Sequence, residues 1–227
     1  MRLNMIKNTP RYTSSILLLT SATLLLLSCQ TGYYYAMEKA GFPKRDLLVS
    51  RVEKARDTQE EAKEQFKSAL EKFGAVVHFD SGALQEKYDQ LSSELERSES
   101  KADAVRDRIN SVENVAEALF DEWETELEQY NNENMRRISQ EKLTKTRQQY
   151  TKLIKVMKRA EQKIEPVLVT FRDQVRFLKH NLNAQAIASI QSELVSVESD
   201  VASLIKEMES AIREADTFIQ AMSKENK

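Results

Sequence analysis

Apolar or small residues recur at steps of three and four over most of the chain after residue 43, which places them on one face of a helix. The longest series runs from Leu84 to Trp123, and its steps alternate between four and three without a break. A series from Ile187 to Met222 is equally regular. An average step of 3.5 residues favours long helices that pack together with a left-handed supercoil.

Two further series complete the pattern. One runs from Leu48 to Val76, with Gln59 at an otherwise apolar position, and the other runs from Tyr150 to Leu178. Beyond Trp123, a four-residue step to Leu127 forms a local stutter. Each series supplies one apolar stripe, which is enough to line a core that several helices share.

Polar stretches between the series read as turns. Their sequences are HFDSGAL, where Asp80 or Ser81 suits a helix N-cap, then NNEN and HNLN. Pro166 lies inside a stripe that continues past it, so we expect a kink there and not a helix end. The pattern predicts four helices, near residues 43–78, 81–130, 134–180 and 183–222.

Glycine and proline support an all-α fold. All four glycines precede residue 83, and Pro166 is the only proline after residue 43. Tight hairpin turns and phosphate-binding loops both need glycine, whereas long helices do not. We expect residues 43–227 to form one elongated antiparallel four-helix bundle, roughly 55–75 Å long at the helical rise. An open dimeric coiled coil is the alternative that the same stripes allow.

The N-terminal segment has the features of an export signal. Residues 1–15 carry three cations and no acid, and an apolar run of 12 residues follows, whereas a membrane-spanning helix needs about 20. The residues Leu26, Leu27, Ser28 and Cys29 resemble the bacterial lipobox. That resemblance implies a signal peptide over residues 1–28, cleavage before Cys29, and acylation of Cys29. A buried helix with a core cysteine is the alternative, and it leaves the charged flank unexplained.

The mature chain would then begin with a lipidated tether, residues 29–42, that attaches the protein to a membrane. Among Gram-negative lipoproteins an aspartate after the cysteine commonly retains the product in the inner membrane, and this chain has Gln30. The resemblance therefore implies the outer membrane, facing the periplasm. Cleavage leaves 31 basic against 36 acidic residues, a net charge of −5. This balance gives no reason to expect a nucleic-acid partner.

The sequence offers little chemistry. The two histidines, His78 and His180, have no second histidine or cysteine nearby, so we expect no metal site. No phosphate-binding loop exists, because no glycine follows residue 82. We therefore predict no nucleotide, no cofactor and no catalytic residue. Trp123, the sole tryptophan, falls on an apolar stripe, and we expect it to pack in the core; a partner contact is the alternative.

Three stretches resemble domain-of-unknown-function family 2959 of Gram-negative bacteria. They are MEKAGFPKRDLLVSRVEKARDTQEEAKEQFKSALEKFGAVVHFD, VAEALFDEWETELEQY and EPVLVTFRDQVRFLKHNLNAQAIASI. The likeness extends from about Tyr35 to Met222 and implies a helical, secreted lipoprotein. It brings no established activity. Long helical proteins of this kind are sometimes labelled DNA-repair ATPases, but this chain lacks the nucleotide loop and carries an export signal.

These observations predict a non-enzymatic envelope lipoprotein that serves as a scaffold, spacer or partner-binding rod. A ligand-binding protein or enzyme with a site between helices is the alternative, and a DNA-repair ATPase is the least favoured. In an antiparallel bundle two turns meet at the end away from the anchor. We expect an unidentified envelope protein to contact this polar tip, which would contain His78, Asp80, His180, Asn181 and Asn183.

Overall fold

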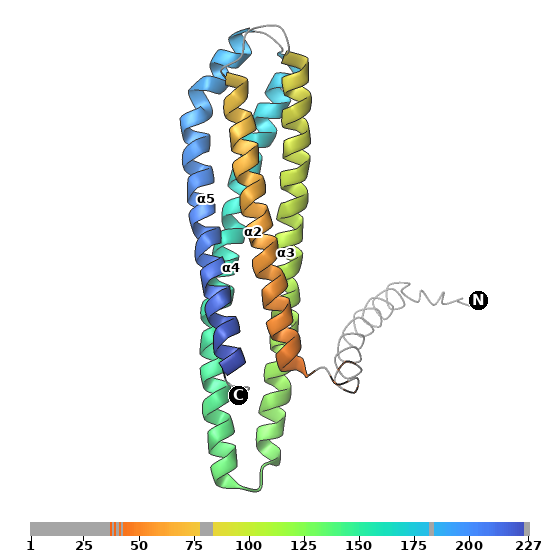
Figure 1. Cartoon of the computed structure of the whole chain (residues 1–227), viewed down its shortest axis with the longest axis vertical. Helices are drawn as coiled ribbons and strands as arrows, with labels where there is room; N and C mark the ends of the chain where they lie inside the picture. The colour runs from red at the N-terminus through yellow and green to blue at the C-terminus, as the bar shows by residue number, and fades with distance from the viewer. Residues whose placement is uncertain are drawn as a thin grey trace, which may run out of the picture. The chain divides into compact units, whose positions relative to one another are not determined.

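The computed structural model describes residues 37, 39, 41, 43–77, 84–181 and 184–224, with the side chains of 76, 77 and 184–187 left aside. Four long helices account for nearly all of these residues (Figure 1). Their bounds are Lys44–Val77 for α2, Leu84–Gln129 for α3, Glu133–His180 for α4 and Ala184–Lys224 for α5. The all-α prediction is confirmed, and every helix end lies within three residues of its predicted position.

The chain divides into two compact units, Met1–Lys44 and Arg45–Lys227. In the first unit, Gly41 has a φ of 88°, a conformation that glycine adopts at little cost. The second unit contains the four-helix bundle. The predicted leader and tether, including Cys29, lie outside the described residues.

Contacts between side chains link the helices into a closed ring. Lys101 of α3 pairs with Glu61 of α2 at 2.7 Å, and Lys158 of α4 pairs with Glu113 of α3 at 2.5 Å. The other two edges are joined by the pairs Lys152–Glu214, between α4 and α5 at 2.8 Å, and Arg56–Asp216, between α2 and α5 at 3.0 Å. The last pair closes the ring within one chain. The stripes therefore meet in an intramolecular core, as the bundle prediction requires.

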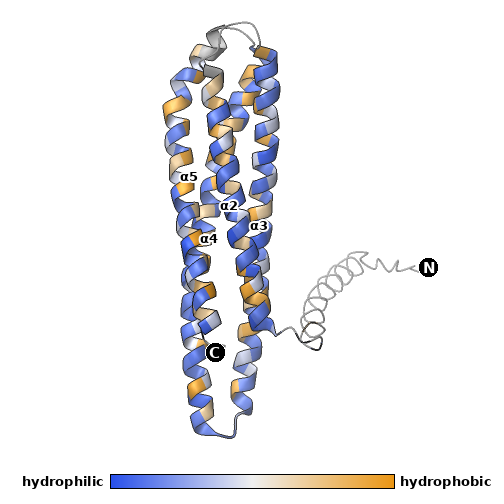
Figure 2. Cartoon of the chain, viewed as in Figure 1, coloured by the Kyte–Doolittle hydropathy of each residue, from blue (hydrophilic) through white to orange (hydrophobic). Residues whose placement is uncertain are grey.

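The predicted stripes form that core. Figure 2 shows hydrophobic residues recurring along each helix between hydrophilic ones. On α2 every predicted apolar position from Leu48 to Phe73 is buried. Phe73 faces Phe171 of α4 across the bundle, with ring centroids 6.0 Å apart. Fully burying a large apolar side chain is worth about 1.5–3 kcal/mol, whereas an exposed ion pair contributes about 0–1 kcal/mol, so the core carries the stability.

Five polar side chains are buried among the described residues: Lys44 at the start of α2, and Gln59, Glu94, Ser98 and Thr146 along the core. Glu94 and Ser98 share a polar partner, because Gln65 Nε2 lies 2.7 Å from Glu94 Oε2 and 3.4 Å from Ser98 Oγ. Ser98 Oγ also donates to the Glu94 carbonyl oxygen at 2.8 Å. Gln59 differs, since both its amide nitrogen and its amide oxygen are buried without a hydrogen-bond partner among the described residues.

Both ends of α4 are capped by asparagines. Asn132 precedes α4, and its Oδ1 accepts from the backbone N–H groups of Asn134 and Met135 at 3.0 and 3.1 Å. Asn181 follows α4, and its backbone N–H donates to the Leu178 carbonyl at 3.1 Å. Between them α4 continues through Pro166, as predicted. The proposed N-cap at Asp80 or Ser81 lies outside the described residues.

At one end, α3 and α4 extend past the other two helices as a two-helix hairpin (Figure 1). Arg45, in the first turn of α2, lines a groove with Trp123 and Lys142, so α2 begins at their level. Lys152 pairs with Glu214, ten residues before α5 ends, which places the end of α5 near Lys142. From residue 128 to 142 every side chain except Ser139 is exposed. Beyond the four-helix core, α3 and α4 therefore continue as a pair of helices without α2 or α5 beside them.

Candidate functional site

The residues of the predicted polar tip are only partly described. His180 is the last residue of α4 and is exposed. Asn181 Nδ2 donates to the Phe177 carbonyl at 2.9 Å, so its side chain helps to end its own helix. His78, Asp80 and Asn183 lie outside the described residues, as do Leu26, Leu27, Ser28 and Cys29. The structure thus places His180 and Asn181 together at one helix end and assigns Asn181 a local capping role.

The projecting hairpin of α3 and α4 carries several exposed apolar side chains close together. Tyr130, Met135 and Ile138 are three of the six large hydrophobic side chains that are exposed in the described residues, at 39%, 58% and 42% exposure. They line one groove of about 390 Å³ together with Trp123, Ser139, Arg45 and Lys142. We call this surface the aromatic flank. It contains two cations and no carboxylate.

Local structure fixes the aromatic flank. The half-buried Trp123 indole Nε1 donates to Ser139 Oγ at 2.8 Å, which ties α3 to α4 across the hairpin. Asn132 caps α4 through the N–H of Met135, so the first turn of α4 is held where it presents Met135 and Ile138. Tyr130, which continues the α3 stripe, is exposed because neither α2 nor α5 reaches its level. The periodicity that buries other residues of this stripe thus leaves Tyr130 uncovered.

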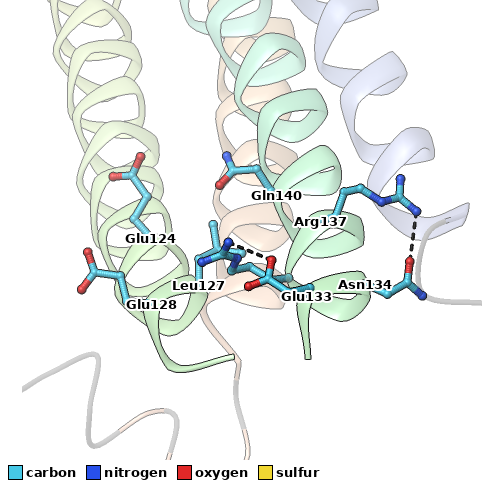
Figure 3. A pocket seen from close by; sticks show the side chains of 8 residues that line it. Glu124, Leu127, Glu128, Glu133, Asn134, Arg137 and Gln140 are labelled. Carbon is cyan, nitrogen blue, oxygen red and sulfur yellow. Dashed lines mark hydrogen bonds and ion pairs between the residues drawn. The ribbon is translucent and has the colours of Figure 1, made fainter. Parts of the chain in front are cut away.

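The opposite side of the hairpin is polar. We call this side the acidic flank (Figure 3). Glu124 and Glu128 project into it from α3, and the remaining polar side chains come from α4. On α4, Arg136 pairs with Glu133 at 2.9 Å, and Arg137 donates to Asn134 Oδ1 at 3.1 Å. The full lining is Glu124, Leu127, Glu128, Glu133, Asn134, Arg136, Arg137 and Gln140. The hairpin is therefore amphipathic across its width.

A cluster of aromatic and charged side chains joins α3 and α4 at the base of the hairpin. Phe120 packs edge-on against Tyr150, with ring centroids 5.4 Å apart, and the Arg147 guanidinium lies 4.9 Å from the Phe120 ring centre. Arg147 also pairs with Glu124 at 2.6 Å, and this hydrogen bond lowers the pKa of Glu124. Burial, reinforced by Glu113 and Glu117, raises the pKa of Tyr150 to about 12. Tyr150 therefore stays protonated and acts as a packing residue near neutral pH.

A small space between α2, α3 and α4 leaves little room for a ligand in the bundle interior. This space lies between Phe73, Leu91 and Phe171 and measures about 10 Å³, about the minimum that one water molecule requires. Among the described residues no group of three or more histidine, cysteine or acidic side chains is arranged to hold a metal ion. Within the same ranges, no helix combines the length and apolar character needed to cross a membrane. The hairpin surface remains as the candidate site.

From the sequence we predicted a partner contact at the polar tip, which stays a prediction, and we expected Trp123 in the core with a partner contact as the alternative; the structure shows Trp123 half-buried. A signal for the hairpin was present, because the second and third predicted helices are longer than the first. In an antiparallel bundle that difference must leave part of a hairpin without neighbours. Thr146 was also missed as a core position, although it continues the α4 stripe by a three-residue step from Leu143.

Comparison with known proteins gives a family and no closer relative. The model of the family described as "Protein of unknown function (DUF2959)" matches residues 33–222 of this chain. No curated protein and no solved structure matches it.

Proposed function

We propose that this chain, which belongs to the DUF2959 family, is a non-enzymatic envelope lipoprotein that acts as an anchored helical rod and presents a contact surface. The observation that carries the proposal is the contrast between the bundle and its hairpin. Apolar stripes are buried along the four-helix part, whereas on the hairpin Tyr130, which continues the α3 stripe, and Met135 and Ile138 of α4 are exposed. Apolar side chains left uncovered in this way favour a contact with another surface.

The anchor is the second part of the proposal. Leu26, Leu27, Ser28 and Cys29 follow a charged flank and a short apolar run, which supports cleavage before Cys29 and acylation of it. Each buried acyl methylene contributes about 0.8 kcal/mol, so two or more chains hold a protein stably at a bilayer. Gln30 favours the outer membrane, with the bundle in the periplasm.

The closed core supports a role as a spacer. Ion pairs link neighbouring helices on all four edges, and buried side chains continue from Leu48 of α2 to Met222 of α5. Protein interiors packed in this way resist compression. A partner protein of the envelope would contact the exposed ends of the rod, and crosslinking in intact cells followed by mass spectrometry would identify it.

The Cys29→Ala variant tests the anchor. We expect this variant to leave the membrane fraction or to accumulate as an uncleaved precursor, because it lacks the thiol that the lipid would modify. A Ser21→Ala variant is the matched control, since it changes the apolar run and keeps the four residues of the cleavage site. If Cys29→Ala fractionates and migrates like the wild-type protein, the lipoprotein assignment fails.

A further inference from the structure

The aromatic flank of the hairpin has a composition that suits the boundary between a bilayer and water. Tryptophan and tyrosine favour this boundary, because each ring offers an apolar body and a polar group. Lysine and arginine bury their methylene stems in such a layer while their charges stay in water. The flank combines Trp123 and Tyr130 with Met135 and Ile138, and no acidic residue lines it.

The flank also lies at the end of the bundle from which the tether leads. Arg45, one residue after α2 begins, lines it. The 16 steps from Cys29 to Arg45 span at most roughly 55 Å when fully extended. An acyl group on Cys29 would therefore keep the lipid surface within reach of this end of the bundle. Because α3 and α4 project past α2 here, their hairpin extends beyond the start of the bundle.

The size of the flank argues for lipid and against a second protein. A stable protein interface buries about 800 Å² on each partner and uses roughly 20–30 residues a side. Only seven residues line the aromatic flank, and two of them are the cations Arg45 and Lys142. A contact of this size is weak by itself. It becomes effective when an anchor holds both surfaces together, because tethering raises the effective concentration to about the millimolar range.

We infer that the aromatic flank rests on the lipid surface and orients the anchored rod. Met135, Ile138 and Tyr130 enter the headgroup region, with Trp123 beside them, while the acidic flank faces water. The inference depends on the proposed lipid anchor, which brings the bundle to the bilayer. The hairpin then acts as a second, weaker attachment that limits the angles the rod can adopt.

Fluorescent labelling of the full-length protein tests this inference. The lipoprotein is reconstituted in phosphatidylcholine vesicles, and an environment-sensitive fluorophore is attached to an introduced cysteine. Ile138→Cys reports the aromatic flank, and Gln140→Cys, two residues along the same helix, reports the acidic flank. We expect spin-labelled lipid to quench the Ile138→Cys label and shift its emission to shorter wavelength. The Gln140→Cys label should show neither change.

The wild-type protein supplies a label-free reading, because Trp123 is its sole tryptophan. Spin-labelled lipid should quench Trp123 emission in the wild type. A Met135→Asp/Ile138→Asp variant should lose this quenching and keep the helix content of the wild type by circular dichroism, since both residues are exposed.

The outcomes separate this inference from the anchor on which it depends. An acylated Cys29 has no free thiol, so the wild type should take up no label; uptake would mean that the anchor itself is wrong. If the wild type takes no label and the Ile138→Cys label is not quenched, only the lipid contact is wrong. Equal quenching at positions 138 and 140 overturns the inference as well. So does shielding of Ile138→Cys by a crosslinked second polypeptide.

Discussion

Replacing Gln59 by methionine should stabilise the bundle. Gln59 is 1% exposed, and its Nε2 and Oε1 atoms are both buried without a hydrogen-bond partner among the described residues. Burial of an unpaired amide costs about 1–3 kcal/mol in protein mutational data. Methionine has a similar length and flexibility and nearly the same helix propensity, so the change removes the polar atoms with little effect on the helix itself.

The expected gain in the free energy of unfolding is about 1–3 kcal/mol. For a domain of this size, each kcal/mol raises the melting temperature by about 2–4 °C. Urea denaturation followed by far-UV circular dichroism measures the gain. The Gln148→Met variant is the matched control, because Gln148 is exposed on α4 and its replacement should change stability by less than about 0.5 kcal/mol.

The reasoning would be refuted if Gln59→Met destabilised the protein by more than about 1 kcal/mol, which is the size of one net hydrogen bond. Such a loss would mean that the Gln59 amide is hydrogen-bonded in solution, for instance to an ordered water molecule. Sedimentation of the variant provides a second check. It should remain monomeric, because Gln59 lies in a core that closes within one chain.

Three further predictions concern the hairpin and its base. Ser139→Ala leaves the Trp123 indole without its partner and should cost about 1 kcal/mol, with faster hydrogen exchange in the first turns of α4. Asn132→Ala removes the N-cap of α4 and should cost about 0.5–2 kcal/mol in urea denaturation, whereas Asn131→Ala, the neighbouring exposed control, should cost little; equal costs would contradict the capping role. Stability should also fall as pH rises from 10.0 to about 12, because the unfolded chain ionises Tyr150 while the folded chain keeps its proton. Tyr150→Phe should show a smaller fall over this range, and an unchanged pH dependence would exclude the effect.

Periodicity predicted the helices well, because most apolar residues that recur at an average step of 3.5 residues face the shared core. From Leu48 to Phe73, each predicted core residue is buried, and Gln59 is buried with them. In an antiparallel bundle with short turns, that spacing leaves few other arrangements. One exception on α3 is local: Glu94 is buried where the stripe predicted Leu95, because Gln65 Nε2 hydrogen-bonds the Glu94 carboxylate.

The candidate site was harder to predict, because it depends on how far each helix extends. Periodicity shows which face of a helix is apolar and does not show whether a neighbour covers that face. Tyr130 continues a stripe most of whose earlier members are buried, yet it is exposed since α2 begins too late to cover it. Ile138 precedes the first buried residues of α4, so nothing in its spacing marked it as a surface residue with a role.

Intact-mass spectrometry of the protein purified from the membrane fraction of its host tests the central claim most directly. The account predicts a chain that begins at Cys29 and carries the added mass of a diacylglycerol and an N-acyl group on that residue. A chain that still contains residues 1–28, or one with an unmodified Cys29 thiol, would contradict the anchored rod.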